Sequence, residues 1–132
     1  MSKTWKQLAR SAAILLALTA IGAAPATDSA ASTKPVKLCG WIRNPTPANW
    51  WLVDSAGQWL ISRQGGYEAE GLDAVPDLSG PRWIVTNGSS YGYGCGCVTA
   101  DIDRKAMTIT RIYVMKQRAI SACRADKKLP RL

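Results

Sequence analysis

The sequence predicts a small antiparallel all-β domain, a curled meander or partly open barrel with two disulfides, that follows an N-terminal signal peptide. Three observations support this fold class. Five segments rich in aromatic and β-branched residues are separated by short turn sequences. No long helix is required after the first 26 residues. The four cysteines suit an exported chain that is too short to bury a large core.

The first 26 residues are expected to be a cleaved export signal. They combine a positively charged start, an uncharged run at residues 11–24 and the cleavage pattern Ala24-Pro25-Ala26. The uncharged run is shorter than the stretch of about 20 residues that spans a membrane as a helix. We therefore expect a periplasmic or secreted protein that is not an integral membrane protein once the signal is cleaved.

Removal of the signal leaves one predicted domain. Residues 27–37 are small and polar and form a flexible leader, and residues 38–132 form a single disulfide-bonded β domain. The signal contains three of the 17 basic residues and none of the nine acidic ones, so the mature charge is 14 − 9 = +5. This balance favours anionic surfaces such as cell wall or lipid headgroups, although scattered lysines and arginines are also typical of ordinary solubilising charge.

The first half of the domain is predicted to contain a loop and a hairpin. Residues 40–49 carry Pro45 and Pro47, which are unsuited to a helix interior, and are expected to be a loop. Aromatic and β-branched residues predict strands at residues 49–54 and 58–62. Asp54-Ser55-Ala56-Gly57 between them has turn chemistry, with Gly57 suited to a positive φ.

The second half is predicted to contain three more strands. They cover residues 82–86, 91–102 and 107–114, and a turn at residues 87–90 joins the first two. In the last strand Arg111 falls on an apolar face, which suggests a bulge. The acidic loop at residues 68–78 has room for a short helical turn, and the basic tail at residues 116–132 is expected to be pinned by Cys123.

The segment Tyr91-Gly92-Tyr93-Gly94-Cys95-Gly96-Cys97 is the centre of the predicted domain. As a strand it places the tyrosines and cysteines on one face and the glycines on the other. The bare glycine face allows another backbone or a flat Trp ring to approach closely.

The four cysteines are predicted to form two disulfides. Residues two apart on a strand lie at the outer limit of disulfide geometry, so Cys95 and Cys97 are the least suitable pair. Cys39 and Cys123 are therefore each expected to bond one of them. A zinc or copper site at Cys95-Gly96-Cys97 is the alternative, but the chain has no histidine and only two other cysteines, so no metal and no cofactor are predicted.

The sequence also resembles an uncharacterised family of small exported bacterial proteins, catalogued as a domain of unknown function. The resemblance covers roughly residues 38 to 130 and implies an exported, cysteine-linked single domain without an established activity. The matching motifs are Cys39-Gly40-Trp41, Asn44-Pro45-Thr46-Pro47-x-Asn49-Trp50-Trp51-Leu52, Asp54 with Gly57-x-Trp59, Gln64-Gly65-Gly66-Tyr67, Tyr91-Gly92-Tyr93-Gly94-Cys95-x-Cys97 and Cys123-Arg124-x-Asp126.

Aromatic residues are the candidate binding residues. Trp50 and Trp51 must point to opposite faces of a strand, so one of them can join Tyr91 and Tyr93 in an aromatic surface for a sugar ring, a peptide or a protein. The remaining tryptophans of the mature chain are expected to fill the core: Trp41, Trp59 and Trp83.

No catalytic residues are predicted, and the protein is expected not to be an enzyme. The absence of histidine excludes Ser-His-Asp and Cys-His arrangements. The carboxylates at residues 68–78 are typical of a polar surface loop, so they are not assigned to glycan hydrolysis. Export takes the chain away from nucleic acid. We expect an exported binding domain that recognises an envelope glycan or anionic polymer through a Trp/Tyr surface; the alternative is a periplasmic protein-binding inhibitor or immunity protein.

Overall fold

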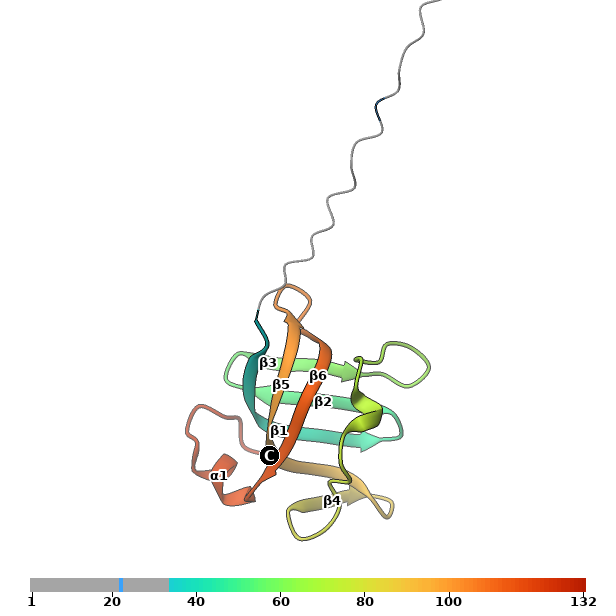
Figure 1. Ribbon diagram of the computed structural model, residues 1–132. Helices are drawn as coiled ribbons and strands as arrows, with labels where there is room; N and C mark the ends of the chain where they lie inside the picture. The colour runs from blue at the N-terminus through green and yellow to red at the C-terminus, as the bar shows by residue number, and fades with distance from the viewer. Residues whose placement is uncertain (1–21, 23–33) are drawn as a thin grey trace, which may run out of the picture. The chain divides into compact units, whose positions relative to one another are not determined.

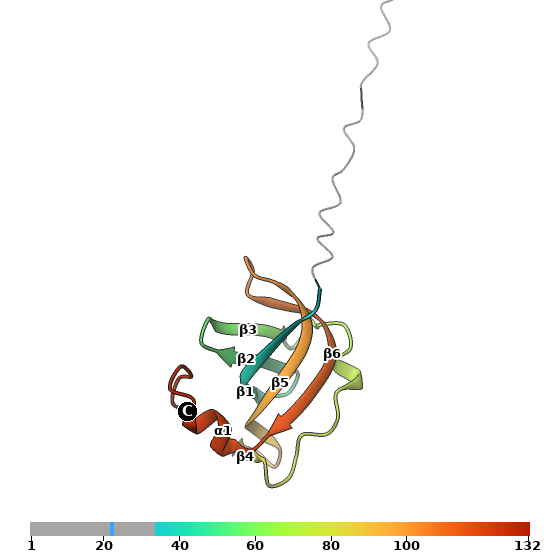
Figure 2. The same ribbon diagram turned by 60° about the vertical axis from the view of Figure 1, so that its left-hand side comes forward.

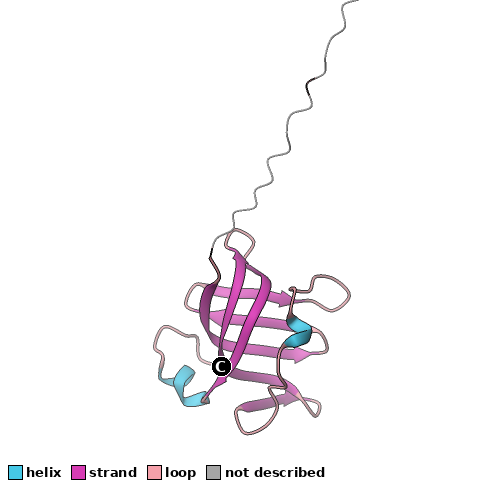
Figure 3. Cartoon of the chain, in the orientation of Figure 1, coloured by secondary structure: helices cyan, strands magenta, loops and turns pink. Residues whose placement is uncertain are grey.

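The computed structural model describes Gly22 and residues 34–132. Apart from Gly22, the predicted signal peptide and most of the predicted leader lie outside this part of the chain. Strands dominate it, and two short helical segments accompany them (Figure 3). The strands are β1 (Val36–Thr46), β2 (Asn49–Asp54), β3 (Gly57–Ser62), β4 (Trp83–Asn87), β5 (Tyr91–Asp103) and β6 (Thr108–Arg118), and the helical segments are η1 (Leu72–Ala74) and α1 (Ile120–Ala125).

These six strands form one sheet that curls into a near-closed ring (Figure 1). The order in the sheet is β1-β2-β3-β6-β5-β4, and β1 also pairs with β5, which closes the ring. The pairings are antiparallel except that of β3 with β6, which meet in parallel at Leu60 and Thr108. The predicted curled β-sheet or partly open barrel is therefore confirmed, with one parallel contact in it.

The connectivity of the ring is that of a Greek-key barrel. Without β4, which pairs only at one end of β5, the order around the ring is β1-β2-β3-β6-β5 and back to β1. In this ring β3 and β6 are parallel. Barrels of the OB-fold type share this connectivity. Such a likeness concerns architecture alone, because one fold hosts many functions.

The prediction of a loop at residues 40–49 is wrong for most of these residues, because β1 continues to Thr46. Pro45 is tolerated there because it lies where both ladders are interrupted. The pairing of β1 with β5 ends at Asn44, and the pairing with β2 shifts register between Arg43 and Thr46. The missing N–H of Pro45 therefore costs no regular ladder hydrogen bond.

Several local predictions are confirmed. At the β2–β3 turn, Asp54 Oδ1 accepts hydrogen bonds from the backbone N–H groups of Ala56 and Gly57 at 2.8 and 3.2 Å, and Gly57 has a φ of 136°. A register shift in the β5–β6 pairing lies beside Arg111, where the bulge is predicted. The short helix η1 lies within the acidic loop.

The inner face of the ring holds the main core. Trp59 and Trp83 are 1% and 9% exposed, as predicted for core tryptophans. A Cβ at Gly94 would lie only 2.8 Å from Cε3 of Trp83, so this glycine lets the indole ring lie against β5. The other buried members of the cluster are Ile42, Leu52, Ile61, Ala69, Leu78, Val98, Ala100, Ile109, Ile112 and Met115.

A second, smaller cluster lies on the outer face of the ring and is covered by the C-terminal segment. Helix α1 and the tail that follows it lie along one side of the ring (Figure 2). The indole N–H of Trp41 donates to the carbonyl of Pro130 at 2.9 Å, which ties the tail to β1. The buried residues of this outer cluster are Trp41, Val53, Cys95, Cys123 and Leu129.

Candidate functional site

The cysteines form two disulfides, Cys39–Cys97 and Cys95–Cys123. The prediction that Cys39 and Cys123 each bond one cysteine of the central strand is confirmed. Because disulfides persist in oxidising compartments, the pair of bonds indicates an extracytoplasmic location. Within the described part of the chain, no helix is long and apolar enough to cross a membrane.

The two disulfides differ in exposure. Cys95 and Cys123 are 0% and 4% exposed and lie in the outer cluster beneath α1. Cys39 and Cys97 are partly exposed and are register partners on the paired strands β1 and β5. The exposed disulfide therefore forms part of the protein surface.

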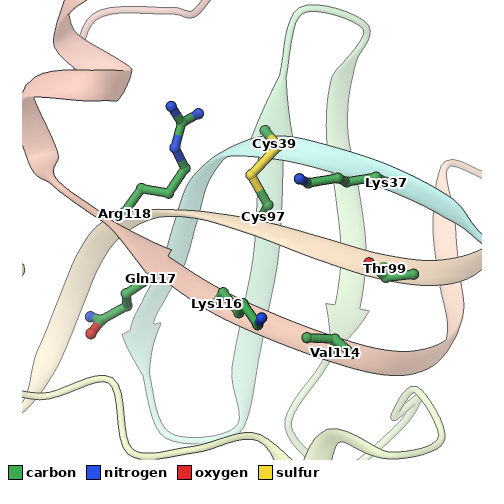
Figure 4. A pocket seen from close by; sticks show the side chains of 8 residues that line it. All are labelled: Lys37, Cys39, Cys97, Thr99, Val114, Lys116, Gln117 and Arg118. Carbon is green, nitrogen blue, oxygen red and sulfur yellow. A yellow bond between two sulfur atoms is a disulfide. The ribbon is translucent and has the colours of Figure 1, made fainter.

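A groove of about 630 Å³ lies over the exposed disulfide. Its walls come from β1, β5 and β6, which are adjacent in the sheet. Figure 4 shows the side chain of Lys37 reaching toward the disulfide and that of Arg118 on its other side. The residues that line this basic groove are Lys37, Cys39, Cys97, Thr99, Val114, Lys116, Gln117 and Arg118.

The charge of the basic groove is one-sided. Lys37, Lys116 and Arg118 contribute three cations, and none of the carboxylates that the structure describes lines the groove. The register explains why they converge: Lys116 is the partner of Cys97, and Arg118 is the partner of Cys95. Cations gathered over one surface without a compensating anion attract an anionic ligand.

The four predicted binding residues separate into two pairs. Trp51 and Tyr93 are both register partners of Arg43 and lie with it in a row across β2, β1 and β5. All three side chains are partly exposed. Tyr93 also packs edge-to-face on Trp41, with ring centroids 5.5 Å apart. Trp51, Arg43 and Tyr93 are called the aromatic row below.

Trp50 and Tyr91 instead border a smaller cavity of about 170 Å³. Trp50 packs against Trp83 of the core, with ring centroids 6.1 Å apart, and Asn44 lies beside it. With the Asn44 amide oriented to satisfy both of its ends, its oxygen accepts from Trp50 Nε1 and its nitrogen donates to the Thr46 carbonyl at 3.1 Å. The polar groups of Trp50 and Asn44 are therefore used within the protein.

Asp77, which also borders the smaller cavity, is similarly occupied. Its two carboxylate oxygens accept from the backbone N–H and the hydroxyl of Ser79 at 2.8 and 2.9 Å. These hydrogen bonds hold the pKa of Asp77 below its usual value, so the group is ionised at neutral pH. The amide, indole and carboxylate groups at this cavity are therefore already paired, which leaves fewer anchors for a ligand.

The acidic loop contributes one ion pair to the described surface. Glu70 is paired with Arg111 at 2.6 Å on the surface. Among the described residues, no cluster of three or more His, Cys, Asp or Glu side chains could hold a metal ion. The basic groove is therefore the site with the most distinctive chemistry.

The three groove cations were not recognisable as a group from the sequence. Lys37 lies near the start of the domain, whereas Lys116 and Arg118 lie near its end, and only the closure of the ring brings them together. The alternation of Lys116 and Arg118 on one face of a strand was the available signal. This alternation does not reveal the register that places Lys116 opposite Cys97 and Arg118 opposite Cys95.

One comparison with known proteins gives a match. A family model described as "Protein of unknown function (DUF4087)" matches residues 33–130. No curated protein and no solved structure matches the chain.

Proposed function

We propose that this chain, which belongs to the DUF4087 family of proteins of unknown function, is a non-enzymatic binding domain. Its basic groove binds an anionic polymer of the cell envelope. The carrying observation is that three cations, and no carboxylate among residues 34–132, line a groove of about 630 Å³. An anionic polymer presents charges in series, which suits cations placed on β1 and β6 with β5 between them. The predicted mature charge of 14 − 9 = +5 acts in the same direction.

The lack of internal ion pairs at the groove cations also supports a binding role. None of Lys37, Lys116 and Arg118 forms an ion pair within residues 34–132, whereas Arg111 pairs with Glu70. Their charges are therefore available to a ligand without breaking an internal contact. Thr99 at the groove wall adds a hydroxyl that can donate to an anionic oxygen.

Charge-matched variants test this proposal. The groove variant carries Lys37→Gln, Lys116→Gln and Arg118→Gln, and the control carries Arg104→Gln, Lys105→Gln and Lys127→Gln. Both lose three charges from exposed positions, but only the first set lines the groove. At low salt we expect the groove variant to bind polyphosphate or polygalacturonate about 10-fold more weakly than wild type, and the control to change much less.

The measurement is binding by fluorescence or calorimetry over a series of salt concentrations. Fewer counterions are released when fewer cations meet the polymer, so the salt dependence should be shallower for the groove variant. Equal losses in the two variants would show that net charge, and not the groove, attracts the polymer. That result would refute the proposal.

We further propose that the protein is periplasmic or secreted. The two disulfides and the predicted signal at residues 1–26 support this location. The exported protein is expected to have the mass of residues 27–132 less four hydrogens, one pair for each disulfide. Intact mass spectrometry without reductant measures this value, and an unprocessed N-terminus would contradict it.

A protein partner, as for an inhibitor or immunity protein, is the second candidate. The aromatic row supports it, because Trp, Tyr and Arg are the residue types most enriched at energetically important interface positions. The binding series above separates the candidates. Absence of polymer binding by the wild-type protein at low salt would leave a protein partner as the remaining candidate.

A further inference from the structure

We propose that the Cys39–Cys97 disulfide is a thiol–disulfide exchange site for anionic low-molecular-weight thiols. The sulfur atoms of this bond form part of the basic groove, between cations from β1 and β6 (Figure 4). The inference goes beyond polymer binding. It uses the same cations but does not depend on a polymer being their ligand.

The register identifies the sulfur that is attacked. Cys97 lies in the middle of the sheet, between Cys39 of β1 and Lys116 of β6. Among the described strands, Cys39 has a paired neighbour on one side alone, because the pairing of β1 with β2 begins at Trp41. An incoming thiolate therefore approaches Cys39 from the open edge of β1.

The exchange step is balanced without a further reactant. The thiolate sulfur forms a bond with Sγ of Cys39 as the Cys39–Cys97 bond breaks, and the electron pair of that bond leaves with Sγ of Cys97. The incoming sulfur is oxidised to the disulfide level and Cys97 is reduced to a thiolate. Lys116, the register partner of Cys97, and Arg118 stabilise the leaving thiolate, since nearby cations favour the charged form.

The fold supports reversible opening of this bond. β1 and β5 are joined by nine registered residue pairs, from Val36 with Ala100 to Asn44 with Gly92, so the two cysteines stay opposite each other after the bond is broken. The second disulfide is buried and remains closed to solvent thiols. It serves as an internal control in the same molecule.

The test compares three thiols of different charge on the oxidised protein: glutathione (anionic), 2-mercaptoethanol (neutral) and cysteamine (cationic). Rates are expressed per thiolate and divided by the rate of the same thiolate with a small uncharged disulfide, which removes differences in both thiol pKa and intrinsic nucleophilicity. At low salt we expect glutathione to react about 10-fold faster than the neutral thiol, with cysteamine slowest, and high salt to remove the difference. Peptide mapping after acid quench should place the adduct on Cys39 and find Cys95–Cys123 intact.

The variants described above supply the controls. The Lys37→Gln, Lys116→Gln, Arg118→Gln protein should lose the preference for glutathione, and the Arg104→Gln, Lys105→Gln, Lys127→Gln protein should keep it. Equal rates for the three thiols, or an adduct on Cys97 or Cys123, would overturn the proposal. A charge preference in this assay with no polymer binding would refute the proposed function and leave the exchange site standing.

Discussion

Replacement of Gly40 by alanine is expected to lower the unfolding free energy by about 3 kcal/mol, because overpacking that the neighbouring atoms cannot relieve lies at the upper end of the usual effects. A Cβ at Gly40 would overlap the carbonyl oxygen of Val53 and lie 2.9 Å from its carbonyl carbon. These are backbone atoms of β2 and cannot rotate away. β1 cannot retreat either, because β5 is paired with its other edge.

Urea denaturation followed by tryptophan fluorescence measures this effect. The matched control is Gly66→Ala, where the nearest atom to a new Cβ would be the Arg63 carbonyl oxygen at 3.8 Å and φ is not in the positive region. That variant should lie within about 0.5 kcal/mol of wild type. A Gly40→Ala protein as stable as the Gly66→Ala protein would contradict the close approach of β1 and β2.

Removal of the buried disulfide is expected both to lower the unfolding free energy and to release the C-terminal segment. The Cys95→Ala, Cys123→Ala protein opens a bond with a sequence separation of 28, which the chain-entropy relation values at about 3.5 kcal/mol. This disulfide also holds α1 against the outer cluster. Its loss should release the tail, break the contact of Trp41 with Pro130 and shift the tryptophan emission to longer wavelength.

The Cys39→Ala, Cys97→Ala protein is the control for the second effect. Its bond has a sequence separation of 58, for which the same relation predicts a loss of about 4 kcal/mol. The β1–β5 ladder still holds the strands together in the native state, so its native emission spectrum should match wild type. Equal spectral shifts in both variants would show that α1 does not depend on the buried disulfide.

The aromatic residues illustrate how far sequence patterns reach. Alternation along a strand correctly separated Trp50 from Trp51, and composition correctly assigned Trp59 and Trp83 to the core. The same alternation grouped Tyr91 with Tyr93, yet Tyr91 borders the smaller cavity with Trp50. A one-dimensional period describes one strand, whereas a cavity depends on the neighbours that the curled sheet provides.

Local sequence patterns were enough to predict the features that depend on neighbouring residues: the β-strand class, the turn at Gly57, the bare glycine face of β5 and the placement of Cys95 and Cys97 in different disulfides. The tertiary structure alone decided that β1 pairs with both β2 and β5, and thereby which cysteine each bond contains. It also decided that cations from both ends of the domain meet over Cys39–Cys97. The physical reason is that ring closure sets the register between distant strands, and no local propensity encodes that register.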